Sequence, residues 1–546
     1  MNIGFKEDLT HEFKSDLKKI SDETIIDAVV AFANTDGGTL YIGVEDDGTI
    51  TGLNESHKDT IGLAALISNK TIPSLSVRVH IEEYEKSIVV AEIPKTRSIV
   101  STISGKMLRR RLKADGTPEN IPMYPYEIIN RLSTLSLYDF SSQPVPEATL
   151  YDFDIVELQR LKNVIREYNG EKNLLSLSDE ELNRALQLTV TIDGIQYPTL
   201  TGMLILGKKN RLKELVPTAE VSIQIMAGTD IIVNENFTEP ILSSFEKIEE
   251  YINARNNSRE IEIGLYRVSV FDIDKRAFRE ALVNAFCHRD YSQLGRIRVH
   301  LDDSGLTITN PGGFIEGIDA NNLIDAEPHG RNPVLADALK RLGLAERTGR
   351  GIDRIFEGSL LFGKIKPDYS QSTDRTVNLF IPKSIPDPAF VEMIQKEQNR
   401  IGRPLSVKTL LILNSLKSLR RASADDISED VYISETYVKA ELEALIESGL
   451  VEGAGIGKNR QYLLSSKVYK NQDNVLGYVR QTGIEKYRNE ELILKVLSEQ
   501  GYISRKDVSL LLNISNSQAY RILNKMTKDK KIKLIGQGRN ARYMQV

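Results

Sequence analysis

The most informative stretch of this sequence is REALVNAFCHRDY, which spans residues 279–291. Its apolar residues recur with helical periodicity, so we expect a helix over Lys275–Cys287. Glu280, Asn284 and His288 follow one another at four-residue spacing, which places all three on one face of that helix. The carbonyl oxygen of Asn284 suits magnesium, and a carboxylate at Glu280 can activate a water for attack on a γ-phosphate. The alternative interpretation is a solvated helix face without a chemical role.

Two glycine-rich loops lie downstream of this helix. One, Asn310 to Gly313, follows a predicted strand over Leu306–Asn310, and the other, Thr348 to Gly351, opens a predicted helix. Glycines at the start of a helix let backbone N–H groups approach phosphate oxygens. Together with the helix face, the two loops predict a nucleotide site. Its expected ATP-binding residues are Asn284, His288, Asn310, Gly312, Gly313, Gly349, Arg350 and Gly351, with Asn284 as the magnesium ligand and Glu280 as the catalytic base.

The segments EALVNAFCHRDY, TNPGG and ERTGRGIDRIF resemble the ATP-binding domain shared by gyrase, histidine kinases and MutL, the GHKL domain. The preceding PTLTGMLILGK fits a divergent bacterial subgroup, and the resemblance covers about residues 150–385. It implies an α/β sandwich that binds ATP with magnesium, and it assigns the base to Glu280, the metal to Asn284 and the nucleotide loops to the glycines. The wider family has an aspartate at the place of Asn310, which accepts the adenine amino proton. An asparagine carbonyl can accept that proton too, so the preference for one nucleobase over another stays open.

The N-terminal part carries EFK at residues 12–14 and FANTDGGTLYIGVEDDG at residues 32–48. These segments resemble the Schlafen-type AlbA domain, an α/β domain whose members bind nucleic acid, over roughly residues 1–135. The vertebrate Schlafens cleave RNA with three acidic residues. The residues in corresponding places here are Glu7, Glu12 and either Glu45 or Asp46.

Clustered carboxylates can hold divalent ions that polarise a phosphodiester, which makes these residues candidates for a nuclease site. The alternatives are a turn at Asp46 to Gly48 and a surface ion pair between Glu12 and Lys14. A basic strand over Lys106–Leu112 follows, with Arg109, Arg110 and Arg111 in a row. Arginines of this kind suit phosphate contacts, although charge also protects the edge of a sheet from pairing.

The C-terminal part contains an approximate repeat. Residues 405–465 and 485–546 each suggest a helix, a short helix, a longer helix and a hairpin, which is the winged-helix arrangement. The first copy has seven Lys and Arg and nine Asp and Glu, so 7 − 9 = −2; the second has thirteen and six, so 13 − 6 = +7. Binding to DNA requires positive charge that neutralises phosphates. We therefore predict that the second copy binds DNA and that the first copy contacts a protein.

A recognition helix is expected over Ser515–Lys528, because asparagine, glutamine and arginine can read base edges. The predicted nucleic-acid contacts of the second copy are Asn516, Gln518, Arg521 and Lys525 in the helix and Arg539 and Arg542 in the wing. The alternative is that both copies bind protein partners and neither touches DNA.

The composition is that of a multidomain globular protein of 546 residues with a net charge of −5. A single cysteine, Cys287, excludes a disulfide within the chain and any cysteine-rich zinc site. No apolar stretch approaches the roughly 20 residues that span a bilayer, and the first residues lack the apolar region of a secretory signal. We therefore expect a cytoplasmic protein without a membrane partner.

Four domains are expected: a Schlafen-type domain at 1–140, a GHKL-like domain with its N-terminal subdomain at 150–385, and winged helices at 400–470 and 485–546. A proline- and serine-containing linker is predicted over Ser141–Ala148, and a strand over Gly202–Leu206.

The preferred interpretation is an ATP-responsive, DNA-binding transcriptional regulator that forms a homo-oligomer, with RNA as the other candidate nucleic acid. The alternative is an ATP-gated, metal-dependent nuclease that acts in defence against phage. A third hypothesis is a nucleotide-sensing scaffold without catalytic activity.

Overall fold

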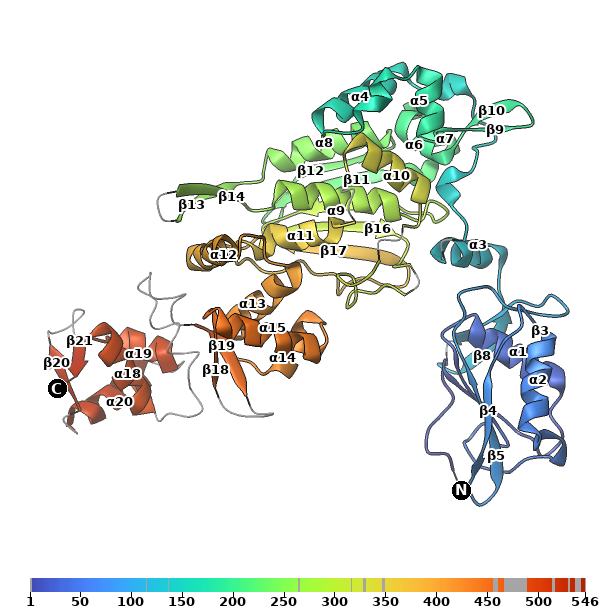
Figure 1. Ribbon diagram of the computed structural model, residues 1–546, viewed down its shortest axis with the longest axis horizontal. Helices are drawn as coiled ribbons and strands as arrows, with labels where there is room; N and C mark the ends of the chain where they lie inside the picture. Colours follow the sequence, from blue (N-terminus) through green and yellow to red (C-terminus); the bar gives the residue numbers. More distant parts are fainter. Residues whose placement is uncertain are drawn as a thin grey trace. The chain divides into compact units, whose positions relative to one another are not determined.

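The computed structural model describes residues 2–113, 115–135, 137–263, 266–315, 317–327, 330–345, 349–454, 460–465, 489–512, 516–528, 531–535 and 542–545. The chain divides into two compact units, Met1–Phe140 and Ser141–Val546, and each is considered by itself. Helices and sheets alternate in both, so this is a mixed α/β multidomain protein (Figure 1). Of the helices in the described ranges, none is long and apolar enough to cross a membrane.

The first unit is built on a four-stranded sheet in the order β1-β2-β5-β4. Strand β1 is parallel to β2, and the other pairs are antiparallel. Alternation along β5 sends Val89 and Ala91 to the main apolar cluster under helix α1, and Ile88 and Val90 to a smaller cluster around Phe13. The elements are β1 (His11–Lys14), α1 (Asp22–Ala33), β2 (Gly38–Ile42), α2 (Thr60–Lys70), β3 (Thr71–Ile72), β4 (Arg78–Glu83), β5 (Ser87–Ile93), β6 (Ser101–Thr102), β7 (Leu108–Leu112), β8 (Pro118–Pro122) and α3 (Pro125–Thr134).

The second unit begins with a small helical part and continues into a five-stranded sheet in the order β12-β11-β15-β16-β17. Strand β11 is parallel to β15, and the remaining neighbours are antiparallel. The elements as far as the last strand of this sheet are α4 (Ile155–Glu167), α5 (Asp179–Ala185), β9 (Thr189–Ile192), β10 (Ile195–Pro198), α6 (Leu200–Leu206), α7 (Lys209–Leu215), β11 (Val221–Ala227), β12 (Asp230–Phe237), α8 (Ile241–Asn253), β13 (Ser258–Ile263), β14 (Tyr266–Phe271), α9 (Lys275–His288), β15 (Ile297–Leu301), β16 (Gly305–Pro311), α10 (Pro333–Leu342), α11 (Gly351–Leu360) and β17 (Thr376–Pro382).

Helices α8, α9, α10 and α11 lie over one face of this sheet (Figure 1). The alternating burial of β11, in which Val221, Ile223 and Ile225 are buried and the residues between them are not, shows that the sheet keeps one apolar face for the helices. Helices α9 and α11 pack closely, because a Cβ at Gly358 of α11 would lie only 2.7 Å from Cβ of Ala277 in α9. This layer of helices positions the ends of α9 and α11 above β16.

Two expectations for the start of this unit were wrong. Gly202–Leu206 is not a strand but part of helix α6, which the Thr199 hydroxyl caps by accepting a hydrogen bond from the Gly202 N–H at 3.0 Å. A short, continuously apolar run fits a buried helix as well as a buried strand. Nor is Ser141–Ala148 an open linker: Ser141 is fully buried, and its carbonyl accepts the Thr201 hydroxyl at 2.9 Å.

The C-terminal part contains two groups of three helices, each followed by a hairpin. In the second group, Val496, Leu497, Val508, Leu523 and Met526 share one apolar core. The elements are α12 (Pro388–Ile401), α13 (Val407–Leu419), α14 (Ala424–Val431), α15 (Glu435–Glu447), β18 (Val451–Ala454) and β19 (Gln461–Leu464), then α18 (Asn489–Gln500), α19 (Arg505–Leu512), α20 (Asn516–Lys528), β20 (Ile532–Ile535) and β21 (Arg542–Gln545).

Candidate functional site

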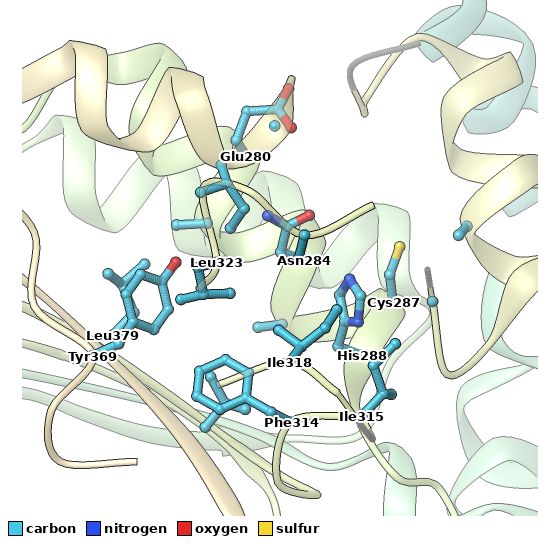
Figure 2. Close-up of a pocket in the computed structure, with 18 of the residues that line it drawn as sticks. Glu280, Asn284, Cys287, His288, Phe314, Ile315, Ile318, Leu323, Tyr369 and Leu379 are labelled. Carbon is cyan, nitrogen blue, oxygen red and sulfur yellow. The ribbon is translucent and has the colours of Figure 1, made fainter. Parts of the chain in front are cut away.

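A cavity of about 210 Å³ lies between helix α9 and strands β16 and β17. Figure 2 shows Glu280, Asn284 and His288 of α9 along one side of it. The cavity brings together most of the residues that the sequence predicted for a nucleotide site. Those in its wall are Glu280, Asn284, His288, Asn310, Gly313, Gly349 and Gly351.

Helix α9 holds the first three of these residues in line. The Asp274 carboxylate caps the helix by accepting the backbone N–H groups of Arg276 and Ala277, each at 2.9 Å. The apolar side of α9 is buried, and this fixes its rotation about its own axis. Glu280 is only 4% exposed, whereas Asn284 and His288 keep partial access to the cavity.

The N-terminus of helix α11 lies next to Glu280 and Asn284 of α9. A Cβ at Gly351 would lie 3.0 Å from Oε2 of Glu280 and 3.9 Å from Oδ1 of Asn284. Glycine therefore allows the start of a helix, with its unsatisfied N–H groups, to approach the carboxylate and the amide. This is the end of the cavity that suits phosphates and a divalent cation.

Gly312 and Arg350 lie outside the cavity wall. Gly312 has a φ of +99°, and a Cβ there would lie 2.8 Å from Cβ of Asp290, so this glycine shapes the turn after β16. Arg350 is ion-paired with Asp353 at 3.3 Å and with Glu357 at 3.4 Å. In this structure its guanidinium therefore stabilises the first turns of helix α11.

The end of the cavity that β16 and β17 form is apolar and suits a nucleobase. Asn310 of β16 is 4% exposed, and it is flanked by Ile308, Val377 and Leu379. The Tyr369 ring closes this end with its hydroxyl directed into the cavity (Figure 2). A planar heterocycle fits such surroundings, because apolar walls with one or two polar groups are typical of ligand sites.

Charged groups next to the cavity wall determine the protonation of the side chains that line it. The Arg331 guanidinium lies 3.5 Å from the Asp290 carboxylate and donates to the Gly313 carbonyl at 3.1 Å. Burial, with the positive charges of Arg331 and Lys340, lowers the pKa of His288 to about 4. Burial also raises the pKa of Cys287 to about 12. Both side chains are therefore neutral near pH 7.

The loop after α9 is fixed by two buried side chains that the sequence analysis did not single out. Arg289 is fully buried and donates to the carbonyls of Asp290 at 2.7 Å and Gly295 at 2.6 Å. Asn332 donates to the carbonyls of Cys287 at 2.8 Å and Arg289 at 2.7 Å. These bonds satisfy carbonyls at the C-terminus of α9, so they keep the site in place.

The cavity wall contains further residues that the sequence analysis missed: Phe314, Ile315, Ile318, Leu323, Ile324, Lys340 and Tyr369. The run of apolar residues in the segment 313–327 was a usable signal, because an exposed loop is normally polar. No local pattern marks Lys340 or Tyr369, since each reaches the cavity from a separate element.

The candidate nuclease carboxylates of the first unit have internal partners. Glu7 accepts the Phe13 N–H at 2.6 Å, and Glu45 accepts the hydroxyls of Ser15 and Thr51, both at 2.7 Å. Glu12 is buried and ion-paired with Arg110 and, at 2.7 Å, with Lys14.

Asp46 is exposed, and its charge and that of Glu12 add to the effect of burial, which raises the pKa of Glu7. The carboxylates thus influence one another. Within the described ranges, however, no three His, Cys, Asp or Glu side chains form a group that could hold a metal ion.

The three arginines of the basic strand β7 are also paired. Arg110 is 2% exposed and bonds Asn120 at 3.1 Å and the Asp8 carbonyl at 2.7 Å, besides its pairing with Glu12. Its neighbours pair with carboxylates as well: Arg109 with Glu127 at 2.5 Å and Arg111 with Glu119 at 2.7 Å.

Helix α20 carries the predicted recognition residues. Arg521 and Lys525 are exposed one turn apart, on the side opposite Leu523 and Met526, which are buried. Arg542 of β21 lies over the Tyr502 ring at 4.1 Å. Asn516 and Gln518 fall in the first turn of α20, and Arg539 lies outside the described residues.

Three parts of the chain match models of protein families. Residues 7–115 match "Schlafen, AlbA_2", residues 295–380 match "Putative ATP-dependent DNA helicase recG C-terminal", and residues 132–222 match a domain of unknown function, DUF8451. No curated protein matches the chain.

Solved structures give similarities of low score. The DIP2311 protein from Corynebacterium diphtheriae is 19% identical over 98% of this chain and 95% of its own, with a TM-score of 0.49. The N-terminal domain of a RecG-related protein from Nitrosomonas europaea is 25% identical over 17% of this chain and 67% of its own, with a TM-score of 0.15. The mRNA-binding domain of elongation factor SelB from E. coli, in complex with SECIS RNA, is 14% identical over 26% of this chain and 100% of its own, with a TM-score of 0.12.

The two informative matches agree with the division of the chain. The first falls on the four-stranded unit, and the second covers β15, β16, α10, α11 and most of β17, which surround the cavity. The chain therefore contains a Schlafen AlbA_2 domain in its N-terminal part and a RecG-like C-terminal domain in its middle.

Proposed function

We propose that this protein is an ATP-binding, nucleic-acid-binding regulator whose nucleotide site is the cavity beside α9. One observation carries the proposal: Glu280 and Asn284 of α9, Asn310 of β16 and Gly351 of α11 come from three separate elements and line a single cavity. Asn284 would hold magnesium, Glu280 would orient or deprotonate the attacking water, and the N-terminus of α11 would receive phosphate oxygens. The residues present fit magnesium, because an amide oxygen and a carboxylate are the hard ligands that it prefers.

The apolar end of the cavity would hold adenine. Asn310 offers both an N–H donor and a carbonyl acceptor to the edge of the base, and Ile308 and Leu379 offer apolar surface to its faces. The assignment to the GHKL type of ATP-binding domain rests on this arrangement and on the motifs around Glu280, Asn310 and Gly351.

A route for the nucleotide signal leads from the cavity to the first C-terminal group of helices. Asp325, in the segment 313–327 that lines the cavity, is ion-paired with Lys408 of α13. Farther along α13, Asn414 donates to the Lys364 carbonyl at 2.9 Å and Lys417 to the Gly363 carbonyl at 2.5 Å, both just beyond α11. Helix α13 is thus attached to the segment that lines the cavity and to the residues that follow α11, and we infer that closure on ATP moves it.

The second C-terminal group would be the nucleic-acid reader. We infer that both groups are winged helices, because each consists of three helices and a hairpin. The exposed Arg521 and Lys525 on α20 would face nucleic acid, and the +7 charge of residues 485–546, from thirteen basic and six acidic residues, would favour the contact. We further propose that residues 400–470 mediate a homo-oligomer, which the mass in solution with and without ATP would test.

The test combines two titrations on the full chain. Calorimetry should show that ATP with magnesium binds the wild-type protein, and fluorescence anisotropy should show that ATP changes its affinity for duplex DNA. The Asn284→Ala variant should lose most of the magnesium-dependent ATP affinity and all of the ATP effect on DNA. A wild-type protein without ATP affinity even at millimolar concentration would refute the nucleotide site.

A metal-dependent nuclease is the second candidate function, because residues 7–115 match the Schlafen, AlbA_2 family model and include the candidate carboxylates Glu7, Glu12 and Asp46. The internal pairing of Glu12 with Arg110 and Lys14 ranks it second, since a catalytic metal would have to replace those cations. Magnesium- or manganese-dependent cleavage of RNA that Glu12→Ala abolishes would reverse this ranking.

A further inference from the structure

Lys340 is a charged residue of the cavity wall to which no role has yet been given. It lies in the last turn of helix α10, half-buried, and lines the same cavity as Glu280, Asn284 and Gly351. Within the part of the chain that the structure describes, its ammonium group has no ion-pair or hydrogen-bond partner. An ammonium group that is partly withdrawn from water without a counter-ion carries a desolvation cost.

The next residue on the same helix shows the contrast. Arg341 is ion-paired with Glu171 at 3.0 Å and also donates to the Ala185 carbonyl, so its charge holds α10 against the neighbouring helices. A cation in the last turn of a helix gains from the helix dipole, but Arg341 already provides that effect. The place of Lys340 in the cavity wall therefore needs another explanation.

The other cations around the cavity are occupied. Arg331 faces Asp290 and the Gly313 carbonyl, and Arg350 is paired with Asp353 and Glu357. His288 cannot supply a positive charge near pH 7, because burial and its cationic neighbours lower its pKa to about 4. Among the described residues that line the cavity, Lys340 is the one lysine or arginine.

The carboxylates of the wall make such a cation necessary for a polyphosphate. Glu280, Glu327 and Asp353 all line the cavity; Arg350 offsets the charge of Asp353, and the Glu280 carboxylate would repel a triphosphate. Magnesium at Asn284 would offset part of this repulsion, and a lysine ammonium is a point charge that donates to phosphate oxygens.

We propose that Lys340 binds the terminal phosphates of the nucleotide and makes the site selective for nucleoside triphosphates over nucleosides. This inference rests on the proposed function, because it assigns a residue within the proposed ATP site. Lys340 is a binding residue in this account, and Glu280 keeps the role of base.

The experiment is a calorimetric titration of the full chain with ATP, ADP and adenosine in the presence of magnesium. Lys340→Ala should weaken ATP binding about 10- to 100-fold, which is the range of a charge-assisted hydrogen bond. Adenosine affinity should stay within about twofold, since adenosine has no phosphate. Lys340→Arg should recover most of the ATP affinity, and Lys213→Ala, an exposed lysine of α7 outside the cavity wall, should change nothing.

The result that overturns the inference is ATP affinity in Lys340→Ala equal to that of the wild type. Equal affinity of the wild type for ATP and adenosine would overturn it as well, while leaving a nucleoside site in place. If the alanine variant is unstable, Lys340→Met keeps the apolar stem of the side chain and allows the same comparison. A wild-type protein that binds none of the three compounds would refute the proposed function itself, and this outcome is recognised without any variant.

Discussion

Strand β7 and the cavity beside α9 use their charged groups in opposite ways. The arginines of β7 are paired within their own unit: Arg109 with Glu127, Arg110 with Glu12 and Arg111 with Glu119. In the cavity, Lys340 has no such partner among the described residues, and the start of α11 faces Glu280 and Asn284. Charges paired within a domain stabilise it or hold its geometry, whereas groups directed into a cavity are available to a ligand.

This difference decides which residues to test for function. Three adjacent arginines look like a phosphate-binding surface in a sequence, because the chain alone does not show whether each charge is already neutralised. The structure gives Arg110 a buried carboxylate 98 positions away in the chain. A count of charges therefore predicts binding well only where the side chains stay exposed, as on α20.

The largest effect should come from the base of the proposed ATP site. Glu280→Gln should slow ATP hydrolysis about 10²- to 10⁴-fold, because a general base contributes on that scale, and should not weaken ATP binding, because it removes a negative charge from the site. Release of phosphate under single-turnover conditions measures the rate, and calorimetry measures the affinity. Unchanged hydrolysis in Glu280→Gln would mean that another group activates the water.

The second test removes the buried cation of β7. Arg110→Ala leaves the buried Glu12 carboxylate without its main partner and should destabilise the first unit by about 3–5 kcal/mol. Arg111 is half-exposed, so Arg111→Ala should cost less than about 1 kcal/mol. Hydrogen exchange of peptides from residues 7–115 in the full chain distinguishes the two effects.

The double variant Glu12→Gln with Arg110→Met serves as the control for this test. It removes both buried charges together and should recover much of the stability that Arg110→Ala loses. If Arg110→Ala instead keeps its exchange protection and loses nucleic-acid affinity, Arg110 is a ligand contact and the contrast between the two regions fails.

The third test compares α20 with β7 in DNA binding. Arg521→Ala should weaken duplex binding by about 1–3 kcal/mol if Arg521 reads a guanine, and should relax preference at one position. Arg111→Ala should have little effect, because Glu119 already neutralises this arginine. Anisotropy titrations at two salt concentrations measure both variants. If DNA binding requires Arg109, Arg110 and Arg111 and survives deletion of residues 485–546, the main nucleic-acid surface lies on β7 and not on α20.

Local patterns in the sequence predicted the parts of the site that short motifs encode. Four-residue spacing placed Glu280 and Asn284 on one face of α9, and glycine positions indicated the loops at Gly313 and Gly351. The positions of Lys340 and Tyr369 in the cavity wall were not predictable in this way, because they depend on how separate elements pack, whereas the apolar run at residues 313–327 was a local signal. The strand expected at Gly202–Leu206 was wrong for a related reason: tertiary burial decides the form of a short apolar run.

The smallest expected effect concerns recognition of the nucleobase. Asn310 can accept from an adenine amino group and donate to its ring nitrogen, but a flipped amide matches the edge of guanine equally well. A carboxylate at this position can only accept: it repels the adenine ring nitrogen but accepts from both the N1–H and the amino group of guanine, so Asn310→Asp should shift the ATP to GTP affinity ratio about tenfold toward GTP. Competition titrations with the two nucleotides measure this ratio.

Because Asn310 is 4% exposed and surrounded by apolar residues, the new charge carries a desolvation cost, and absolute affinity for both nucleotides should fall together. Asn310→Ala is the matched control: it removes both the donor and the acceptor, and the ratio should then move toward unity. A ratio that is identical in all three proteins would mean that Asn310 does not contact the base, and Tyr369, whose hydroxyl is directed into the same end of the cavity, would become the residue to test.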